Sequence, residues 1–243
     1  MRFLAMLRIR NEERWIKRVI DSLLPICAEL YVMDDHSSDT TADIVLAFDK
    51  ERVHYIPSPF AKDDLDESRD KNFLLDYVIS GKPDWVLCID GDEELEEMGP
   101  DIIRETVKTP QWHSYSFRVI YLWNSEQTIR VDGVYKTFAR PSMFRMVNPA
   151  FRFKTTPWGG NLHCSSIPQE LLHGYQRCSV RLKHYGYIDP ELRRKKFDWY
   201  NKVDPDNTGE DCYRHIIQGD PGGPTPDVKL KWAGPLKLES WVE

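Results

Sequence analysis

The most constraining feature of the sequence is the alternation of short apolar runs with amphipathic segments over the first hundred residues. The apolar runs have the length of buried strands, at residues 3–7, 30–33, 53–56 and 85–89. The segments between them place apolar residues at helical spacing, through residues 16–24, 44–48 and 65–78. Strands that alternate with helices in this way predict an α/β fold with a mostly parallel sheet and helices on both faces.

The second half of the chain is less regular. Its patterns predict strands at residues 114–122, 134–138, 142–146 and 180–184, a basic helix at 191–199 and a loop at 219–226. We see no linker near residue 110 and therefore expect one domain over 1–243. Its parts are a sheet half at 1–110, an irregular half at 111–217 and a C-terminal loop and tail at 218–243.

Composition excludes several classes of protein. Hydrophobic residues make up 41% of the 243 residues and aromatic residues 12%, which excludes a mainly disordered chain. No apolar run approaches the roughly 20 residues of a membrane span, and the N-terminal apolar run is too short for a signal peptide. The five cysteines form no CxxC pair, which favours reduced thiols and a cytoplasmic protein.

The net charge of −6 is unevenly distributed. Residues 1–110 hold 14 Lys and Arg against 25 Asp and Glu, whereas the remainder is basic. An acidic half suits a divalent cation and a basic half suits an anionic ligand, although uneven solvated surface charge explains the same pattern equally well.

Polar residues follow three of the predicted strands directly. Arg8 ends the first strand, Asp34 and Asp35 end the second, and Asp90 and Asp92 follow the strand at 85–89. In parallel sheets, ligands bind beyond the carboxyl ends of the strands, so these side chains are expected to converge at one edge.

The two acidic motifs at this edge have different chemistry. Asp90 and Asp92 are one residue apart and offer hard oxygen ligands for Mg²⁺ or Mn²⁺, with a solvated acidic turn as the alternative. Asp34 and Asp35 are able to accept hydrogen bonds from a nucleotide base or ribose, with helix capping as the alternative.

Together these motifs, at residues 7–13, 31–41 and 85–93, resemble the family-2 glycosyltransferases of the GT-A fold. The likeness is specific over about residues 3–95. It implies a Rossmann-like sheet, a nucleotide-diphosphate sugar as donor and a DxD element in which Asp92 ligates the metal and Asp90 contacts ribose or metal. The donor residues that it implies are Arg8, Asn11, Glu12, Asp34, Asp35, Arg69 and Asp90.

Two further residues are suggested by the likeness in the second half. The segment at 183–187 resembles a late HYGY element, which implies that His184 completes the metal shell. A lone histidine near a strand end is otherwise more often structural. Arg145 matches a position that meets a donor phosphate or an anionic acceptor, with a salt bridge at the sheet edge as the alternative.

The catalytic base is the least defined part of the site. Relatives carry His-Glu after a Trp-Gly loop, where this chain has His163 and then Cys164. An inverting transfer needs a carboxylate or histidine close to the acceptor. We rank Asp132 first, His163 second and the pair Glu210/Asp211 third; without a base among them, a retaining reaction is expected.

The sequence thus predicts a metal-dependent glycosyltransferase that uses Mn²⁺ or Mg²⁺ and a UDP-sugar. The acceptor is not readable from the sequence, and a glycan, a cell-surface precursor, a protein and modified DNA all remain open. The alternatives are a non-catalytic nucleotide- or carbohydrate-binding protein and a nucleotidyltransferase. The last is disfavoured because residues 8–13 contain no glycine.

Overall fold

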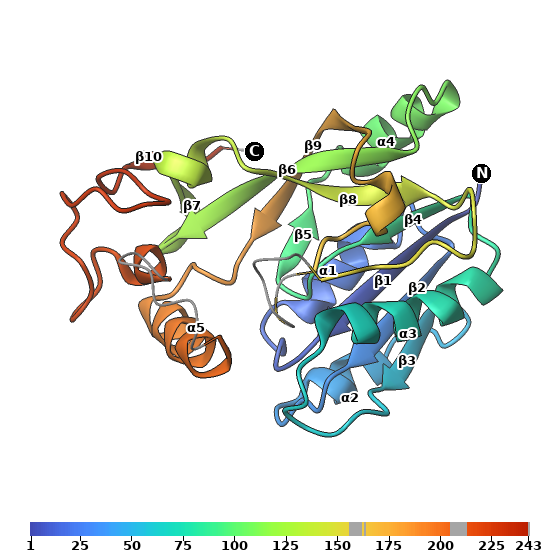
Figure 1. Cartoon of the computed structure of the whole chain (residues 1–243), viewed down its shortest axis with the longest axis horizontal. Helices are drawn as coiled ribbons and strands as arrows, with labels where there is room; N and C mark the ends of the chain where they lie inside the picture. Colours follow the sequence, from blue (N-terminus) through green and yellow to red (C-terminus); the bar gives the residue numbers. More distant parts are fainter. Residues whose placement is uncertain (156–161, 163, 205–212, 243) are drawn as a thin grey trace. The chain divides into compact units, whose positions relative to one another are not determined.

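The computed structural model describes residues 1–155, 162, 164–204 and 213–242. The chain divides into two compact units. The first contains residues 1–117 and 140–181, and the second contains residues 118–139 and 182–243. Residues 140–181 thus belong with the N-terminal unit, which differs from the expected division near residue 110. We describe each unit by itself (Figure 1).

The N-terminal unit is built on a mostly parallel sheet. The strands of this unit are β1 (Phe3–Ile9), β2 (Glu29–Asp34), β3 (Val53–Pro57), β4 (Trp85–Cys88), β5 (Glu93–Leu95) and β8 (Ala139–Arg145), of which β5 pairs with β9 (Tyr175–His184) and not with the others. The main order is β8-β4-β1-β2-β3. The pairs β1–β2, β1–β4 and β2–β3 are parallel, whereas β8 pairs with β4 in antiparallel orientation. This arrangement confirms the predicted α/β class.

Helices cover this sheet. They are α1 (Ile16–Leu23), α2 (Thr41–Leu46), α3 (Glu67–Ser80) and α4 (Gly99–Lys108). The start of α3 is fixed by Asp66, whose side chain accepts a hydrogen bond from the Arg69 amide and so satisfies one of the helix's orphan donors. Figure 1 shows α3 lying in front of β1 and β2, against which it packs.

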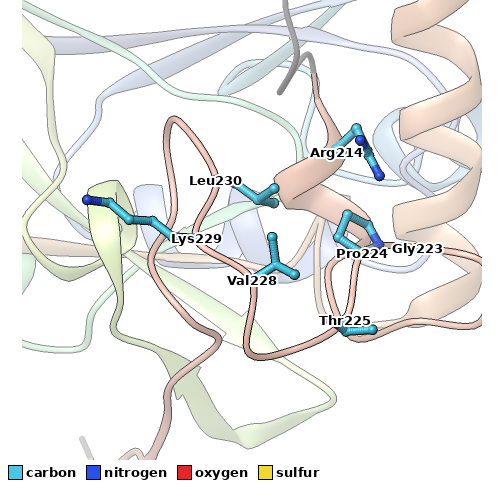
Figure 2. Close-up of a pocket in the computed structure, with 7 residues that line it drawn as sticks. All are labelled: Arg214, Gly223, Pro224, Thr225, Val228, Lys229 and Leu230. Atoms are coloured by element: carbon cyan, nitrogen blue, oxygen red, sulfur yellow. The ribbon is translucent and has the colours of Figure 1, made fainter.

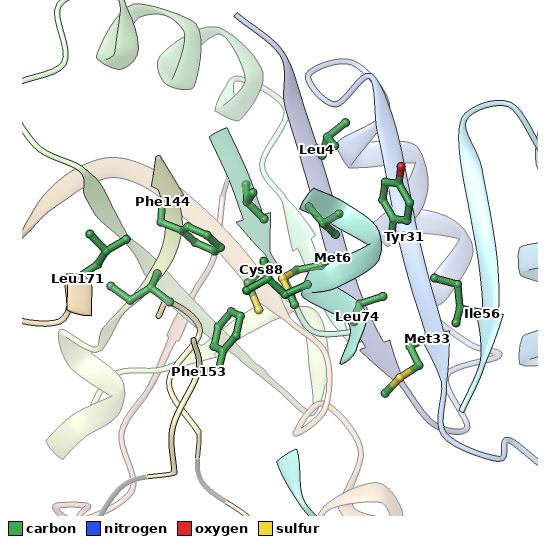
Figure 3. Close-up of a cluster of buried hydrophobic side chains, with 14 residues drawn as sticks. Leu4, Met6, Tyr31, Met33, Ile56, Leu74, Cys88, Phe144, Phe153 and Leu171 are labelled. Atoms are coloured by element: carbon green, nitrogen blue, oxygen red, sulfur yellow. The ribbon is translucent and has the colours of Figure 1, made fainter. Parts of the chain in front are cut away.

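One hydrophobic cluster joins α3 to the sheet (Figure 3). Alternate strand residues point to this face, as the two-residue period of a strand requires. They are Leu4, Met6, Tyr31, Met33, Val86 and Cys88. From the helix come Leu74, Leu75 and Val78, all fully buried. Both faces of these central strands are buried, which explains why they appear in the sequence as continuous apolar runs.

The C-terminal unit has a smaller sheet. β6 (Ser114–Trp123) and β9 (Tyr175–His184) each run from the first unit into the second. The pairs β6–β7 and β7–β10 are antiparallel. The other elements of this unit are β7 (Ser125–Arg130), β10 (Leu238–Ser240), α5 (Pro190–Val203) and short 3₁₀ turns at Gly133–Lys136 and Arg214–Ile217.

The strand predicted at 134–138 is wrong, because the chain forms the 3₁₀ turn Gly133–Lys136 there. Gly133 has a φ of +46°, and an added Cβ would lie 2.5 Å from the Trp232 carbonyl oxygen. The chain therefore turns sharply at a position that only glycine tolerates. The helix α4 and the strands β5, β7 and β10 had no clear sequence signal, since they are short or polar.

Within the described part of the chain, no helix combines the length and apolar character that crossing a membrane requires. The four cysteines described there (Cys27, Cys88, Cys164 and Cys178) are free thiols.

The core cluster generates a stability prediction. Leu74→Ala removes a fully buried side chain from α3 and is expected to cost about 2–5 kcal/mol of unfolding free energy. Leu46→Ala, at a half-exposed position on α2, is the matched control and is expected to cost less than about 0.5 kcal/mol. Urea denaturation measures both; equal losses would contradict the assignment of Leu74 to the core.

Candidate functional site

The parallel register brings the ends of three strands to one edge of the N-terminal sheet. Arg8 pairs with Met33 and Ile9 with Asp34, so the ends of β1 and β2 coincide. On the other side of β1, Met6 pairs with Cys88, the last residue of β4. The residues that follow these strands therefore lie at the same edge, as the sequence predicted.

Arg8 links three elements at this edge through ion pairs. Its Nη2 donates to Asp35 Oδ2 at 2.7 Å, and its Nε donates to Asp70 Oδ2 at 2.8 Å. The second oxygen of Asp70 accepts hydrogen bonds from Arg69 at 2.9 and 3.1 Å. Asp70 is almost fully buried and was missed by sequence reasoning, although it follows Arg69 directly. Arg8, Asp35 and Arg69 are thus brought together, with Asp70 as their common partner.

Asp34 has a structural role in the loop after β2. Its Oδ1 accepts a hydrogen bond from the Ser37 amide and its Oδ2 accepts one from the Tyr55 hydroxyl, both at 2.9 Å. Both oxygens are therefore engaged within the protein, and Asp34 is a weaker candidate for donor contact than Asp35.

Asn11 and Glu12 also connect the loop after β1 to the loop after β2. Asn11 adopts a left-handed conformation with a φ of 57°, and its side-chain oxygen accepts a hydrogen bond from the Ser38 amide at 2.8 Å. The Glu12 amide donates to Thr41 Oγ1 at 2.8 Å. A Cβ added to Gly91 would lie 2.8 Å from Glu12 Cγ, so this loop also approaches the DxD segment closely.

The acidic segment after β4 is held by Arg140 of β8. Arg140 Nη1 donates to Asp90 Oδ2, and Arg140 Nη2 donates to Glu93 Oε2. Burial acts to raise the pKa of Asp90, but the charges of Arg140 and Lys71 outweigh it and hold that pKa below its ordinary value, despite the neighbouring Asp92. Asp90 is therefore an anion whose charge Arg140 balances.

Arg145 does not reach this edge. In the antiparallel pairing of β8 with β4, Arg145 lies opposite Trp85, the first residue of β4. Met143 lies opposite Leu87, nearer the end that leads to Asp90. The structure therefore places Arg145 away from the acidic segment, and Arg140 is the arginine of β8 that meets it, because strand direction decides which end of β8 lies beside Asp90.

A second buried cation lies behind this edge. Lys71 on α3 forms a 3.0 Å ion pair with Glu67 and donates to the carbonyl oxygens of Cys164 and Ser165. Burial raises the pKa of the Cys164 thiol to about 12, despite the Lys71 charge. Cys164 is therefore a neutral thiol at physiological pH and is unsuited to act as a base. His163, the neighbouring candidate, lies outside the described residues.

Asp132, the first-ranked base, is in a structural salt bridge. Its Oδ2 accepts from Arg130 Nε at 2.9 Å and from the Lys237 amide at 3.0 Å, while its Oδ1 accepts from Arg130 Nη2 at 3.0 Å. Arg130 is almost completely buried. Protonating Asp132 would leave that buried guanidinium without its counter-ion, so the structure disfavours Asp132 as a base. Asp211, the third-ranked candidate, lies outside the described residues.

His184 belongs to an aromatic cluster of the C-terminal unit. Its ring lies edge-on to the rings of Tyr121 and Tyr187, at centroid distances of 5.2 and 4.8 Å. Among the described residues, no group of three or more His, Cys, Asp or Glu side chains is arranged to hold a metal ion.

The carboxylates of the N-terminal unit do not fit a divalent cation in the observed arrangement. Asp90 and Asp92 offer the hard oxygen ligands that Mg²⁺ and Mn²⁺ prefer. However, the guanidinium of Arg140 already engages Asp90 and Glu93. A metal ion at this position therefore requires Arg140 to move.

A pocket of about 640 Å³ lies in the C-terminal unit (Figure 2). It is lined by Arg214, Gly223, Pro224, Thr225, Val228, Lys229 and Leu230. None of the predicted site residues lines it, and the Lys229 side chain points away from Val228 and Thr225 in Figure 2. We therefore do not count this pocket as part of the site.

The sheet and its polar edge define an α/β class of protein, and comparison with known proteins makes this more specific. Residues 7–101 match the profile of Glycosyl transferase family 2. Over this part of the chain, the match confirms the resemblance to family 2 that is seen in the sequence.

Similar proteins and structures support the same fold. An uncharacterized protein of Mycobacterium tuberculosis, Rv3786c, is 29% identical over 220 residues, which cover 85% of this chain and 51% of that protein. The chain thus spans about half the length of the curated relatives it matches.

The structure of S. aureus TarS aligns with a TM-score of 0.55 and 14% identity, covering 89% of this chain and 42% of TarS. TarS residues 1–349 in complex with UDP-GlcNAc align with a TM-score of 0.54 and 13% identity, covering 89% and 70% of the two chains. The fold is therefore that of the GT-A glycosyltransferases.

The Asp132 salt bridge generates a prediction. Asp132→Asn is expected to lower the free energy of unfolding by about 3 kcal/mol, because it leaves the buried Arg130 without its counter-ion. Asp227→Asn, in the same unit but fully exposed, is expected to leave stability unchanged. Chemical denaturation compares them. A fully stable Asp132→Asn variant that has lost sugar transfer would contradict the structural role and restore Asp132 as a base.

Proposed function

We propose that this protein is a glycosyltransferase that transfers a sugar from a nucleotide-diphosphate sugar, with a UDP-sugar as its donor. The observation that carries the proposal is the ion-pair cluster of Arg8, Asp35, Asp70 and Arg69 at the carboxyl edge of a family 2 domain. The structure of TarS with UDP-GlcNAc supports the choice of a uridine nucleotide, since it shares the fold.

The cluster is suited to hold a nucleoside. Asp35 lies in the loop that follows β2, and only one of its oxygens receives the Arg8 ion pair. A carboxylate fixed in this way keeps acceptor capacity for the N–H of a base or for a ribose hydroxyl. Because Asp70 is buried and paired with two guanidinium groups, it fixes both Arg8 and Arg69 in position beside Asp35.

The reaction would proceed by attack of an acceptor oxygen on the anomeric carbon of the donor sugar. The bond between the acceptor oxygen and the anomeric carbon forms as the bond between that carbon and the diphosphate oxygen breaks. The proton of the acceptor hydroxyl passes to a base. The departing diphosphate gains charge, which guanidinium and ammonium groups at the site would stabilise. A divalent cation, Mn²⁺ or Mg²⁺, would supply further neutralisation only if Arg140 left Asp90, which with Asp92 would then hold the ion.

The presence of a catalytic base distinguishes a glycosyltransferase from a non-catalytic binding protein. Asp132 is engaged in a salt bridge and Cys164 is a neutral thiol, so neither supplies a base in the described residues. This observation favours, as a second candidate, a nucleotide-sugar-binding protein that has kept the fold. His163 and Asp211 are the remaining predicted bases. The free thiols suit a reducing, cytoplasmic environment.

The first test of the proposal is nucleotide binding. We expect UDP to raise the thermal midpoint more than GDP, CDP, TDP or ATP, because a ligand that binds only the folded state stabilises it by mass action. Each nucleotide is measured with Mn²⁺, with Mg²⁺ and with EDTA. No shift with any nucleotide would contradict the proposed donor, and slow hydrolysis of a UDP-sugar would separate the enzyme from the binding protein.

A variant tests the site itself. Asp35→Asn is expected to weaken UDP binding about tenfold or more, because it removes a charged hydrogen-bond acceptor from the nucleoside. Asp43→Asn on the exposed face of α2 is the matched control and is expected to bind UDP normally. Calorimetry measures both affinities. Equal affinities in the two variants would remove Asp35 from the donor site.

A further inference from the structure

The carboxyl edge of the sheet has a further component from far along the chain, at Cys164 and Ser165. Cys164 packs against the core cluster that contains Cys88, the last residue of β4 (Figure 3). Burial raises the pKa of both thiols, and the charge of Lys71 acts in the opposite direction on each, so one cation is near both. The segment at 164–165 therefore lies beside the end of β4.

Two side chains of α3 bind the backbone of this segment. Glu67 Oε2 accepts a hydrogen bond from the Cys164 amide at 2.7 Å. Lys71 Nζ donates to the carbonyl oxygens of Cys164 at 3.4 Å and Ser165 at 3.2 Å. Glu67 and Lys71 lie one helical turn apart and form an ion pair of 3.0 Å, so they hold the segment as one unit.

A third side chain of α3 binds the stretch that pairs with this segment. Asn72 Nδ2 donates to the Phe153 carbonyl oxygen at 2.9 Å, and the Phe153 amide donates to Asn72 Oδ1 at 2.8 Å. Two residues later, Thr155 forms an antiparallel bridge with Cys164. Glu67, Lys71 and Asn72 thus form a clamp that binds both paired stretches through backbone groups.

The clamp contains a buried cation, since the Lys71 side chain is only 4% exposed. Burial acts to lower the pKa of Lys71, but the Glu67 carboxylate outweighs burial and raises that pKa above its ordinary value. The three N–H groups of the ammonium have three acceptors, which are Glu67 and the two carbonyl oxygens. Apolar side chains often stabilise a core as well as a buried ion pair does. What the ion pair adds is a set of directed hydrogen bonds that fixes the position of the segment.

We propose that the clamp positions the segment at 164–165 for sugar transfer, so that its three members are positioning residues. The same turns of α3 carry Arg69 and Asp70, which belong to the ion-pair cluster at the nucleotide edge. One helix therefore sets the placement of both parts of the edge. The inference deepens the proposed function and rests on it. In the sequence, Cys164 directly follows His163, one of the remaining candidate bases.

The first measurement is amide hydrogen exchange of the full chain without nucleotide. Lys71→Met is expected to speed exchange of the Cys164 amide at least tenfold, while the amides at 75–78 inside α3 stay protected. Asp76→Asn is the matched control, because it removes an exposed ion pair of 3.2 Å between the same helix and Arg152. Its exchange is expected to be unchanged. Unaltered exchange at Cys164 in Lys71→Met would overturn the proposal.

A second variant separates positioning from stability. The double variant Glu67→Gln with Lys71→Met removes both charges, so it is expected to be more stable than Lys71→Met alone and to fold where that variant does not. Its kcat for release of UDP from a UDP-sugar is expected to be at least tenfold below that of the unaltered protein, because misplaced groups slow the reaction. Its affinity for UDP is expected to change less than twofold.

The probes are UDP-glucose, UDP-galactose and UDP-GlcNAc for turnover and UDP for calorimetry. If the unaltered protein binds UDP and releases it from one of these sugars, and the double variant has the same kcat, the proposed function stands and the positioning role is wrong. If the double variant loses UDP affinity in proportion to its rate, the clamp serves nucleotide binding and the positioning role is again wrong. If the unaltered protein itself neither binds nor releases UDP, the proposed function is wrong, and the role in transfer is overturned with it.

Discussion

The parallel pairing of β1 with both β2 and β4 is the constraint on which the rest of the N-terminal unit depends. Parallel strands end at the same edge, so the loops that follow them must share one region of space. Since all three strands are buried on both faces, their registers are held by side-chain packing on α3 and on the opposite face. The polar residues at the edge are thereby positioned without forming part of the core.

Charge balance is the second organising principle of this edge. Within the acidic residues 1–110, arginine and lysine side chains partner several of the buried acids individually. Arg8 and Arg69 partner Asp70, and Lys71 partners Glu67. Such pairs hold their side chains in fixed positions, because breaking any pair leaves a buried charge uncompensated. In the C-terminal unit, the Arg130–Asp132 pair is a structural ion pair of the same kind.

Sequence reasoning identified the strands of the first unit and the residues that follow them, because short apolar runs and their polar ends are local signals. It missed Asp70, which lies within a helix and becomes part of the edge only when α3 packs on the sheet. It also chose Arg145 over Arg140. Both flank the same apolar stretch of β8, and only the antiparallel register with β4 shows which of them faces Asp90. Asp132 was chosen because it looked isolated in the sequence, although Arg130 two residues earlier folds back onto it.

The sequence by itself determined the fold class, the strands of the first hundred residues and the acidic edge that follows them, because each depends on local periodicity and on residues adjacent in the chain. Only the tertiary structure decided which charges are paired and which are available to a ligand. Ion pairs join residues as distant in sequence as Arg140 and Asp90, and strand register, which hydrophobic packing sets, controls which side chains meet. The chemistry of the edge therefore depends on the packing of the core beneath it.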